Sequence, residues 1–452
     1  MIKMRISSFA ISIFAGVLIL TGVVMFAGNN GSVAVTDTKI DSNSKTLTSH
    51  APIYINGNAD FSDADDDGVS NPGAAGTASD PYIIENWDIS ASSADGIEIR
   101  NTTVYFVVRK CVISDGFQPE HNVYNYGIYF YDVQNGKIEN CEIHNSFRGV
   151  ELEASSNNVI TLSQTYNNDR GIELDASSNN TIASNQIYGN SGGVELSHSS
   201  NNNTMTSNQI YYNGGGIELC SSSNNHITNC WIHNNLYGGI CIGYSSNNTC
   251  AANQIYNNSW GIEFDSSSDN TIASNRIYGN SGGIKLSHSS NNNIISSNQI
   301  YYNGGGIELR SSSDNDIINC QIYNNYGTGV YLTYSSNNSI INSEVYNNKC
   351  DGIRLWYSSN NEVHYSNIYN NTDYGIYNYN TEVTHSVNAT YNWWGSADGP
   401  SGIGSGRGNA VSDNVLYNPW LTEPVKLLEE AKPSVTLWLY IIIPLIIIIV
   451  LA

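Results

Sequence analysis

Four carboxylates are the clearest candidates for chemistry in this sequence. Glu151 and Glu153 are two residues apart, and Glu173 and Asp175 repeat that pair 22 residues later. If residues 22 apart lie on adjacent strands, each carboxylate has another about 5 to 7 Å away. This range suits the paired carboxylates of a glycoside hydrolase or the oxygen ligands of Ca²⁺. The alternative is an exposed charge ladder, neutralised by the arginine that precedes each pair.

These carboxylates lie within a repeat that governs most of the chain. Thirteen glycines, each followed by a branched aliphatic residue, recur every 22 or 23 residues, except for one step of 31 residues. So short a period indicates one structural unit stacked on copies of itself. The glycines are Gly96, Gly127, Gly149, Gly171, Gly193, Gly216, Gly239, Gly261, Gly283, Gly306, Gly329, Gly352 and Gly375.

Each repeat predicts short β-strands. In the unit that begins at Gly171, apolar residues alternate with polar ones. Three strands separated by Ser, Asn and Gly turns fit in 22 residues, whereas two helices with their turns do not. Ile172 and Leu174 must share one face, and Glu173 must point the other way. We expect an all-β solenoid of about 13 or more coils, with three short strands per coil and aliphatic side chains inside.

Asparagine marks a second position in each coil. A short amide side chain tolerates a left-handed backbone and can bond to the coils above and below. We therefore expect an inward amide ladder that satisfies the polar groups of buried turns. Its predicted members are Asn158, Asn180, Asn202, Asn225, Asn248, Asn270, Asn292, Asn315, Asn338 and Asn361.

In these units the sequence resembles the right-handed parallel β-helix repeat proteins of the pectin-lyase-like superfamily, including their NosD-like branch. The resemblance rests on Gly-Ile-x-Leu, Ser-Ser-Asn-Asn and Asn-x-Ile-Tyr units from about Asp95 to Tyr379, and on end segments at 76–84 and 391–400. It implies a single-stranded, right-handed parallel β-helix. Lyases and hydrolases of this superfamily carry their acidic sites on the corresponding sheet. The resemblance therefore also implies that an acidic site would lie on the sheet that holds Glu151 and Glu173.

The NosD-like branch implies a copper role, which the residues of this chain do not support. Of four methionines, only Met205 lies in the repeats, and His198, His226 and His233 form no close pair. A soft-metal site needs clustered Cys, His or Met side chains. We therefore expect no copper site.

One segment near the N-terminus allows Ca²⁺, although no cofactor is required. Asp63, Asp65 and Asp67 have the opening spacing of a calcium loop, but Ala74 stands where an EF-hand has its bidentate acid. An EF-hand is excluded, and the spacing permits only a looser Ca²⁺ site.

Part of the repeat has been duplicated. Residues 171–235 and 261–325 match at 50 of 65 positions, an offset of 90 residues that equals four coils. The differences fall mostly on outward or turn positions. A catalytic residue within these coils would have been copied or lost, so we look for chemistry elsewhere, near Gly127 to Asp175.

A row of tyrosines on the third strand of the coil is the second candidate surface. The rings flank an inward aliphatic residue, so they face solvent and stack along the solenoid. They could contact a long glycan, or they could simply stabilise the sheet. The glycan-binding candidates are Tyr166, Tyr188, Tyr211, Tyr256, Tyr278, Tyr301, Tyr323, Tyr346 and Tyr369.

Composition and the two ends of the chain indicate an exported protein. Charged residues make up 13% and the net charge is −22, which disfavours nucleic acid as a partner. Lys3 and Arg5 precede an apolar run, and the C-terminal 18 residues are apolar and long enough to span a membrane. We expect 1–28 as signal peptide or anchor, 29–50 as linker, 51–420 as β-helix (repeats about 95–379, cap 380–420), 421–434 as linker and 435–452 as transmembrane helix. This topology places the β-helix on the extracellular side.

Two of the eight cysteines should meet. Cys111 and Cys141 each precede an inward aliphatic residue by two positions on consecutive coils, which predicts a disulfide, with stacked thiols as the alternative. Cys230 and Cys320 share that position but lie four coils apart. They should replace an inward Asn or Ser of a ladder.

Three functions fit these observations. The favoured one is a membrane-anchored extracellular protein that binds a polysaccharide, another glycan or an envelope surface without catalysis. The second is a polysaccharide lyase or glycoside hydrolase that acts at the acidic patch. The third is a structural component of the cell envelope. A loop that closes a cleft above the acidic patch would favour the enzyme.

Overall fold

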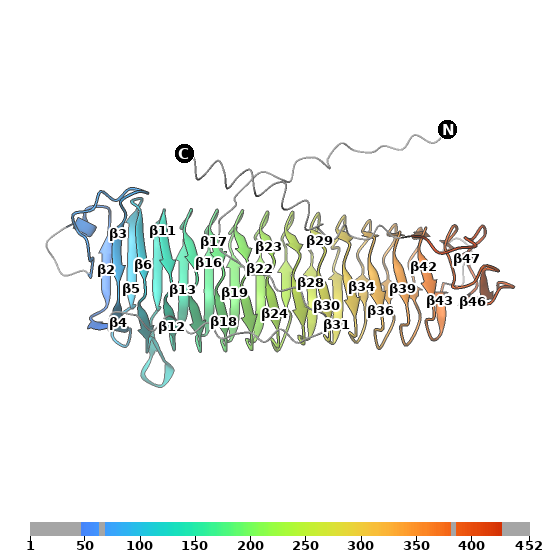
Figure 1. Ribbon diagram of the computed structural model, residues 1–452, viewed down its shortest axis with the longest axis horizontal. Coiled ribbons are helices and arrows are strands. Elements are labelled where there is room, and N and C mark those ends of the chain that lie inside the picture. The colour runs from blue at the N-terminus through green and yellow to red at the C-terminus, as the bar shows by residue number, and fades with distance from the viewer. Residues whose placement is uncertain (1–46, 63–67, 381–385, 427–452) are drawn as a thin grey trace, which may run out of the picture. The chain divides into compact units, whose positions relative to one another are not determined.

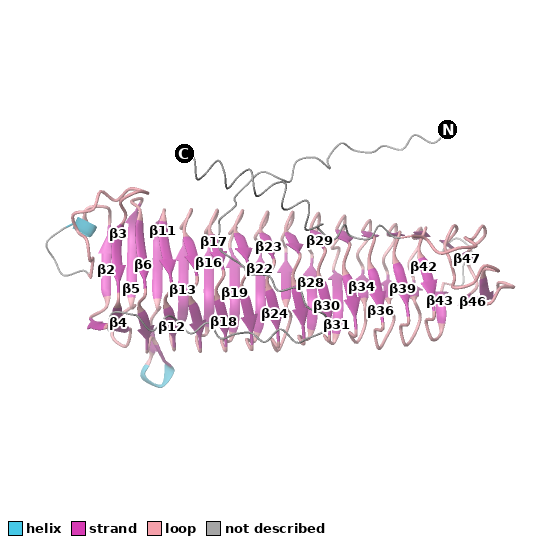
Figure 2. Ribbon diagram, viewed as in Figure 1, coloured by secondary structure: helices cyan, strands magenta, loops and turns pink. Residues whose placement is uncertain are grey.

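The computed structural model describes residues 47–62, 68–380 and 386–426. Figure 1 shows these residues as coils stacked along one direction, and Figure 2 shows that they are almost entirely strand and turn. Their strands form three parallel sheets that share one core, in about 13 turns. The all-β solenoid with three strands per coil is confirmed.

The first sheet holds the strands that follow the repeated glycines. In spatial order it contains β2 (Ile53–Asn56), β5 (Ile97–Thr102), β10 (Ile128–Val133), β13 (Arg148–Glu153), β16 (Arg170–Asp175), β19 (Gly192–Ser197), β22 (Gly215–Cys220), β25 (Ile240–Gly243), β28 (Trp260–Asp265), β31 (Gly282–Ser287), β34 (Ile307–Arg310), β37 (Val330–Thr333), β40 (Ile353–Trp356), β43 (Tyr374–Asn378), β46 (Gly408–Val411) and β45 (Pro400–Gly402).

The second sheet contains β3 (Tyr82–Glu85), β6 (Phe106–Arg109), β11 (Gly136–Glu139), β14 (Val159–Thr161), β17 (Thr181–Ala183), β20 (Thr204–Thr206), β23 (His226–Thr228), β26 (Thr249–Ala251), β29 (Thr271–Ala273), β32 (Ile294–Ser296), β35 (Asp316–Ile318), β38 (Ser339–Ile341), β41 (Glu362–His364), β44 (Val387–Asn388) and β47 (Val415–Leu416).

The third sheet contains β1 (Thr48–His50), β4 (Trp87–Ser90), β7 (Val112–Ser114), β12 (Glu142–His144), β15 (Gln164–Tyr166), β18 (Gln186–Tyr188), β21 (Gln209–Tyr211), β24 (Trp231–His233), β27 (Gln254–Tyr256), β30 (Arg276–Tyr278), β33 (Gln299–Tyr301), β36 (Gln321–Tyr323), β39 (Glu344–Tyr346) and β42 (Asn367–Tyr369). A short hairpin, β8 (Phe117–Gln118) and β9 (Val123–Tyr124), encloses the turn η2 (Pro119–His121), and η1 (Asp60–Ser62) lies near the N-terminal end.

The repeated glycine is required by close approach of neighbouring coils. A Cβ on Gly171 would lie 2.6 Å from the carbonyl oxygen of Gly193 and 2.7 Å from the side chain of Ile187. Any larger residue would have to push the next coil away. The glycine spacing therefore reports the coil spacing directly.

The core is aliphatic, and polar ladders line its corners. Ile172, Leu174, Ile182 and Ile187 from one coil are fully buried. At the corner before the second sheet, the backbone N–H of Asn158 donates to Oδ1 of Asn180 at 2.9 Å. Such bonds repeat from coil to coil, so the buried turns keep their polar groups satisfied.

The predicted amide ladder is confirmed, but in two coils the inward asparagine is one residue later than predicted. In the coils that begin at Gly193 and Gly283, Asn203 and Asn293 are the buried ladder members. Asn202 and Asn292, which the sequence predicted, instead have left-handed backbone with φ of 57° and 55°. The left-handed residue directly precedes the inward amide here as in the other coils, for example Asn157 before Asn158. The extra residue of these two coils lies before both.

The predicted terminal membrane helices lie at 1–28 and 435–452, outside the described residues. Within residues 47–62, 68–380 and 386–426, no helix is long and apolar enough to cross a membrane. The predicted calcium-binding aspartates, Asp63, Asp65 and Asp67, also lie outside the described residues.

Candidate functional site

The four predicted carboxylates lie together on the outward face of the first sheet. Pairing of β13 with β16 places Glu151 beside Glu173 and Glu153 beside Asp175. Neighbouring strands are about 4.8 Å apart, so each pair is within reach of one ligand. We call these four residues and the side chains that contact them the acidic cluster.

Three of the four carboxylates have a partner. Nε of Arg148 donates to Glu173, and its Nη1 donates to Asp169 at 2.8 Å. The hydroxyl of Tyr129 donates to Oε2 of Glu153 at 2.5 Å. Asp175 lies 2.9 Å from Nδ1 of His198. The predicted neutralisation by arginine therefore applies to Glu173 but not to the whole cluster.

Glu151 is the exception, because the described residues offer its carboxylate no hydrogen bond or ion pair. The residue is only 7% exposed. Burial raises its pKa to about 8, the negative charge of Glu173 adds to this shift, and Arg148 opposes it. The Glu151 carboxyl is therefore largely protonated at neutral pH. Burial also raises the pKa of Glu173, although Arg148 holds this carboxylate as an ion-pair partner.

Two tyrosines that the sequence analysis overlooked cover this end of the cluster. Tyr129 precedes Glu151 in the outward row of the sheet and is 6% exposed. Tyr126, just before β10, has its pKa raised to about 12 by burial and by the nearby charge of Glu151. Arg100 lies 5.0 Å from the ring centre of Tyr129. The register could have revealed Tyr129, since it stands 22 residues before Glu151.

The loop that causes the 31-residue step packs beside the cluster. Its residues Phe117 and Tyr124 contact each other and the ring of Phe147, at 5.8, 5.9 and 5.5 Å between centres. The guanidinium of Arg148 lies 4.0 Å from the centre of the Phe147 ring. The loop therefore supports the arginine that pairs with Glu173. Figure 1 shows it projecting from the stack.

Chemically, the acidic cluster combines a proton donor with a carboxylate. Glu151 can give up a proton at neutral pH, and Glu173 on the next strand is held by a cation. Two carboxyl groups whose surroundings differ in this way are the usual basis of acid–base catalysis. The burial of Glu151 limits direct access to it.

The predicted tyrosine stripe is a continuous stack on the third sheet. From His144 through Tyr166 to Tyr369, with His233 inserted, successive ring centres are 4.6 to 5.2 Å apart and nearly parallel, at 1 to 13°. Trp393 covers the last ring at 5.3 Å. Each ring face is covered by a neighbour, so a sugar ring cannot stack on it. Only the ring edges and hydroxyl groups remain available to a ligand.

The predicted disulfide is not formed, although its two cysteines meet as expected. Cys111 and Cys141 are both buried free thiols. Their strands pair at Val112 and Glu142, and the hydrogen bond between the two thiols lowers the pKa of Cys111, while burial raises that of Cys141. Both belong to a corner ladder, which the backbone N–H of Cys141 continues to Oγ of Ser163 at 3.1 Å.

Cys230 and Cys320 occupy ladder positions, as predicted. Nδ2 of Asn208 lies 3.9 Å from Sγ of Cys230, and Nδ2 of Asn298 lies 3.9 Å from Sγ of Cys320. Each thiol therefore replaces an inward amide. Over the described part of the chain, no group of three or more His, Cys, Asp or Glu residues could hold a metal ion.

Comparison with known families gives two matches. A family described as the right handed beta helix region matches residues 21–210 and 120–242. A family described as periplasmic copper-binding protein (NosD) matches residues 222–349 and 261–419. Of the residues considered for copper, Met205 is buried in the core and His198 lies beside Asp175. No curated protein matches the sequence.

Several solved structures are similar. The A-module of mannuronan C-5 epimerase AlgE6 from Azotobacter vinelandii is 17% identical, with 73% of this chain and 92% of that chain covered and a TM-score of 0.46. The periplasmic alginate epimerase AlgG is 16% identical, covering 80% and 83%, with a TM-score of 0.35. A pectate lyase is 14% identical, covering 60% and 76%, with a TM-score of 0.33. At this level of similarity, their activities carry no inference for this chain.

Proposed function

This chain is a right-handed parallel β-helix protein of the pectin-lyase-like superfamily, and we propose that it is an exported protein that binds a glycan on the outward face of its first sheet. One observation carries the proposal. The central outward position of this sheet holds hydrogen-bonding or aromatic side chains on successive strands: Glu98, Tyr129, Glu151, Glu173, Glu195, Glu218, Cys241, Glu263, Lys285, Glu308, Tyr331, Arg354 and Tyr377.

A linear polymer of hydroxyl-bearing rings suits such a row. Carboxylates accept strong hydrogen bonds from hydroxyl groups, and aromatic side chains pack against the apolar face of a sugar ring. The row repeats at the strand spacing over many coils, so one glycan chain can be contacted at several points. The tyrosine stripe on the third sheet offers hydroxyl edges only, which makes it the weaker candidate surface.

The test compares the two surfaces in the full-length protein. A glycan array should show binding that is lost when Glu195, Glu218 and Glu263 are changed together to Ala. Changing Tyr188, Tyr278 and Tyr323 together to Phe should leave binding intact. Loss of binding in the second variant alone would show that the glycan binds the tyrosine stripe instead of the first sheet. An array without any glycan signal would contradict the proposal.

Glycosidic bond cleavage at the acidic cluster is a second candidate function. It is favoured by the protonated, unpartnered Glu151 beside the arginine-held Glu173. Glu151 would act as the acid and Glu173 as the carboxylate. Release of reducing or unsaturated sugars from an array-positive glycan tests this, with and without Ca²⁺. Glu151→Gln should abolish product and keep binding, whereas absence of product from the unmodified protein would rule the activity out.

A further inference from the structure

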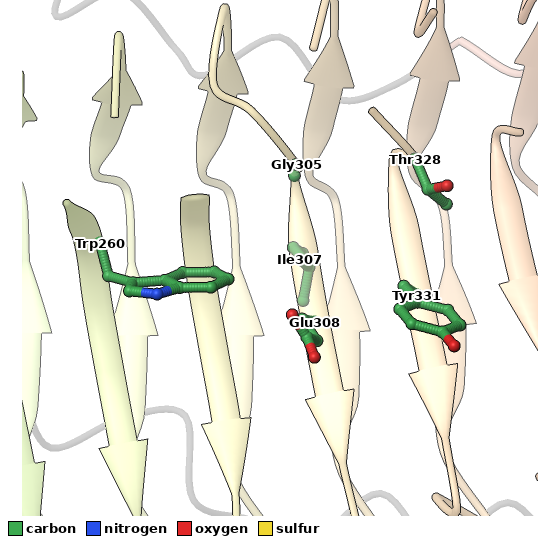
Figure 3. Close-up of a pocket in the computed structure, with 7 residues that line it drawn as sticks. Trp260, Gly305, Ile307, Glu308, Thr328 and Tyr331 are labelled. Carbon is green, nitrogen blue, oxygen red and sulfur yellow. The ribbon is translucent and has the colours of Figure 1, made fainter. Parts of the chain in front are cut away.

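A depression in the outward face of the first sheet lies between β28 and β37, far from the acidic cluster in the stack. It encloses about 170 Å³ and is lined by Trp260, Gly305, Gly306, Ile307, Glu308, Thr328 and Tyr331. Figure 3 shows the indole of Trp260 extending along the sheet toward the strand of Gly305, with Tyr331 on the far side and Glu308 between them. Typical ligand pockets are larger, roughly 300 to 1,000 Å³, so this one has room for a single ring.

Two glycines create the depression. The indole of Trp260 lies directly on Gly282, where any side chain would collide with it. Gly305, just before the next strand β34, has open space at the position of a Cβ, with the nearest atom 3.9 Å away. The first glycine lets the indole lie flat, and the second leaves the floor empty.

The duplicated coils provide an internal comparison. Ninety residues earlier, Arg170, Glu195, Gly238 and Cys241 stand at the positions of Trp260, Lys285, Thr328 and Tyr331. Only the Glu195 and Lys285 positions fall inside the matched ranges 171–235 and 261–325, and the others directly flank them. There the side chain of Arg170 covers Gly192 and its Nε donates to Oε2 of Glu195 at 2.6 Å. Glu218 folds back over Gly215, and Cys241 folds back over Gly238.

In the first copy, contacts between its own side chains therefore fill the space that is open in the second copy. In the second copy the residue that matches Glu218 is Glu308, and it does not fold over its glycine. Four coils that are otherwise closely matched differ here in their exposed residues. The differences bring two aromatic rings and a hydroxyl group to one place.

The charges around the depression leave one carboxylate free to accept hydrogen bonds. Nζ of Lys285 donates to Glu263 at 2.6 Å and lies 5.5 Å from the Trp260 ring centre. Glu308 makes only a loose ion pair in the described structure, 4.0 Å from Nε of Arg310. Its carboxylate and the Thr328 hydroxyl can therefore fix the orientation of a bound polyol.

We propose that the Trp260–Glu308–Tyr331 depression binds one uncharged hexopyranose unit of a glycan. The apolar face of the sugar packs on the indole, and adjacent hydroxyl groups donate to Glu308. The inference rests on the proposed glycan binding and adds a location and a class of sugar. It uses residues outside the acidic cluster and outside the tyrosine stripe.

Charge selects against the other classes of ligand. A quaternary or primary ammonium group would compete with Lys285, which already lies near the indole. A uronate would meet the carboxylates of Glu263 and Glu308 on a chain with a net charge of −22. A neutral sugar neither competes with Lys285 nor is repelled by the carboxylates of Glu263 and Glu308.

The test is calorimetric titration of the full-length protein with linear hexamers of glucose, mannose and galactose, and with hexamers of galacturonic acid and glucosamine. At least one neutral hexamer should bind, and Trp260→Ala should weaken it by about tenfold or more, as truncation of a central aromatic contact does. Gly305→Leu fills the floor without removing an aromatic ring and should have the same effect. Trp231→Ala, at an exposed Trp on the third sheet, is the control and should change nothing.

The outcomes separate this site from the broader proposal. Far-UV circular dichroism first establishes that each variant keeps the fold. Equal binding of a neutral hexamer by both variants and the unmodified protein would overturn the site while leaving glycan binding in place. Preferential binding of a charged hexamer that the variants lose would overturn the class of sugar. If no hexamer binds, the site is overturned, and the glycan array decides separately whether the protein binds a glycan elsewhere.

Discussion

At the scale of single residues, the side chains that depart from the repeat carry the chemistry. Within the acidic cluster, Glu151 is the one carboxyl that is buried without a hydrogen-bond or ion-pair partner among the described residues. Burial raises its pKa. Trp260 and Tyr331 replace a charged residue and a cysteine of the earlier copy, and they turn a filled surface into a depression. Both sites depend on which neighbour a side chain meets on the next coil.

The raised pKa of Glu151 predicts a pH-dependent stability. The folded state holds its proton up to about pH 8, whereas a glutamate in the unfolded chain loses it near the ordinary pKa of 4.5. Stability should therefore fall as pH rises from about 4.5 to 8 and then level off, by an amount on the order of a few kcal/mol. Glu151→Gln should melt like the unmodified protein at pH 5 and at a higher temperature at pH 9. Glu120→Gln, on the exposed hairpin, should not change the pH profile.

Burial also predicts the order in which cysteines react. Iodoacetamide should label the exposed Cys220 in the native protein, whereas Cys111 and Cys141 should resist it, because the reagent needs an accessible thiolate. After unfolding without reductant, both buried thiols should become labelled, as mass spectrometry of peptides can show. A Cys111–Cys141 peptide pair that stays unlabelled until reductant is added would restore the disulfide that the sequence predicted.

At the scale of the structural elements, the corner ladders hold each coil in register with the next. Asn185 illustrates the arrangement, since its Nδ2 donates to the carbonyl of Ile160 at 2.9 Å and its Oδ1 accepts from the N–H of Ser163 at 3.0 Å. Each buried amide thus satisfies backbone groups of the preceding coil. The ladder and the aliphatic core therefore stabilise the same strands.

Removal of one ladder amide should be costly. Asn185→Ala leaves a buried N–H and a buried carbonyl without partners, which should lower the free energy of unfolding by about 2 to 4 kcal/mol. Asn185→Ser should lower it less, because serine already fills this column at Ser163 and Ser343. Denaturant melts of the two variants give the comparison. Equal stability of Asn185→Ala and the unmodified protein would contradict the ladder's role.

At the scale of the whole solenoid, each coil contacts only its neighbours, so stability is close to a sum of coil and interface contributions. The four-coil duplication is tolerated for this reason. It lengthened the stack and preserved the register, because 90 residues are a whole number of coils. One copy could then acquire new outward residues without disturbing the other.

This modularity predicts which internal deletions fold. Deletion of residues 171–260 joins Arg170 to Gly261 and preserves the coil register, so the shortened protein should keep its β-rich circular dichroism spectrum and melt cooperatively. Deletion of 171–248 removes a fraction of a coil and should yield aggregated or unfolded protein, because inward and outward positions no longer match. The shorter folded variant lacks Trp260 and should lose neutral glycan binding.

Sequence and structure contributed at different levels. The glycine period predicted the coil and the strand order, because close packing of Gly171 against Gly193 leaves no other residue type possible. Strand alternation likewise predicted that Glu151 and Glu173 would face outward on adjacent strands. These features depend on short-range geometry that one coil repeats, which is why a sequence pattern can show them.

The remaining features depend on distances between side chains of different coils. The sequence predicted stacked tyrosines, but only the ring spacing shows that their faces are closed to sugars. It aligned Cys111 with Cys141 but left open whether they form a disulfide. It gave no sign of the Trp260 depression, because an empty space depends on how one indole lies over the glycine of the next coil. The sequence by itself determined the period, the inward and outward positions and the duplication, whereas the tertiary structure decided burial, partners and empty space.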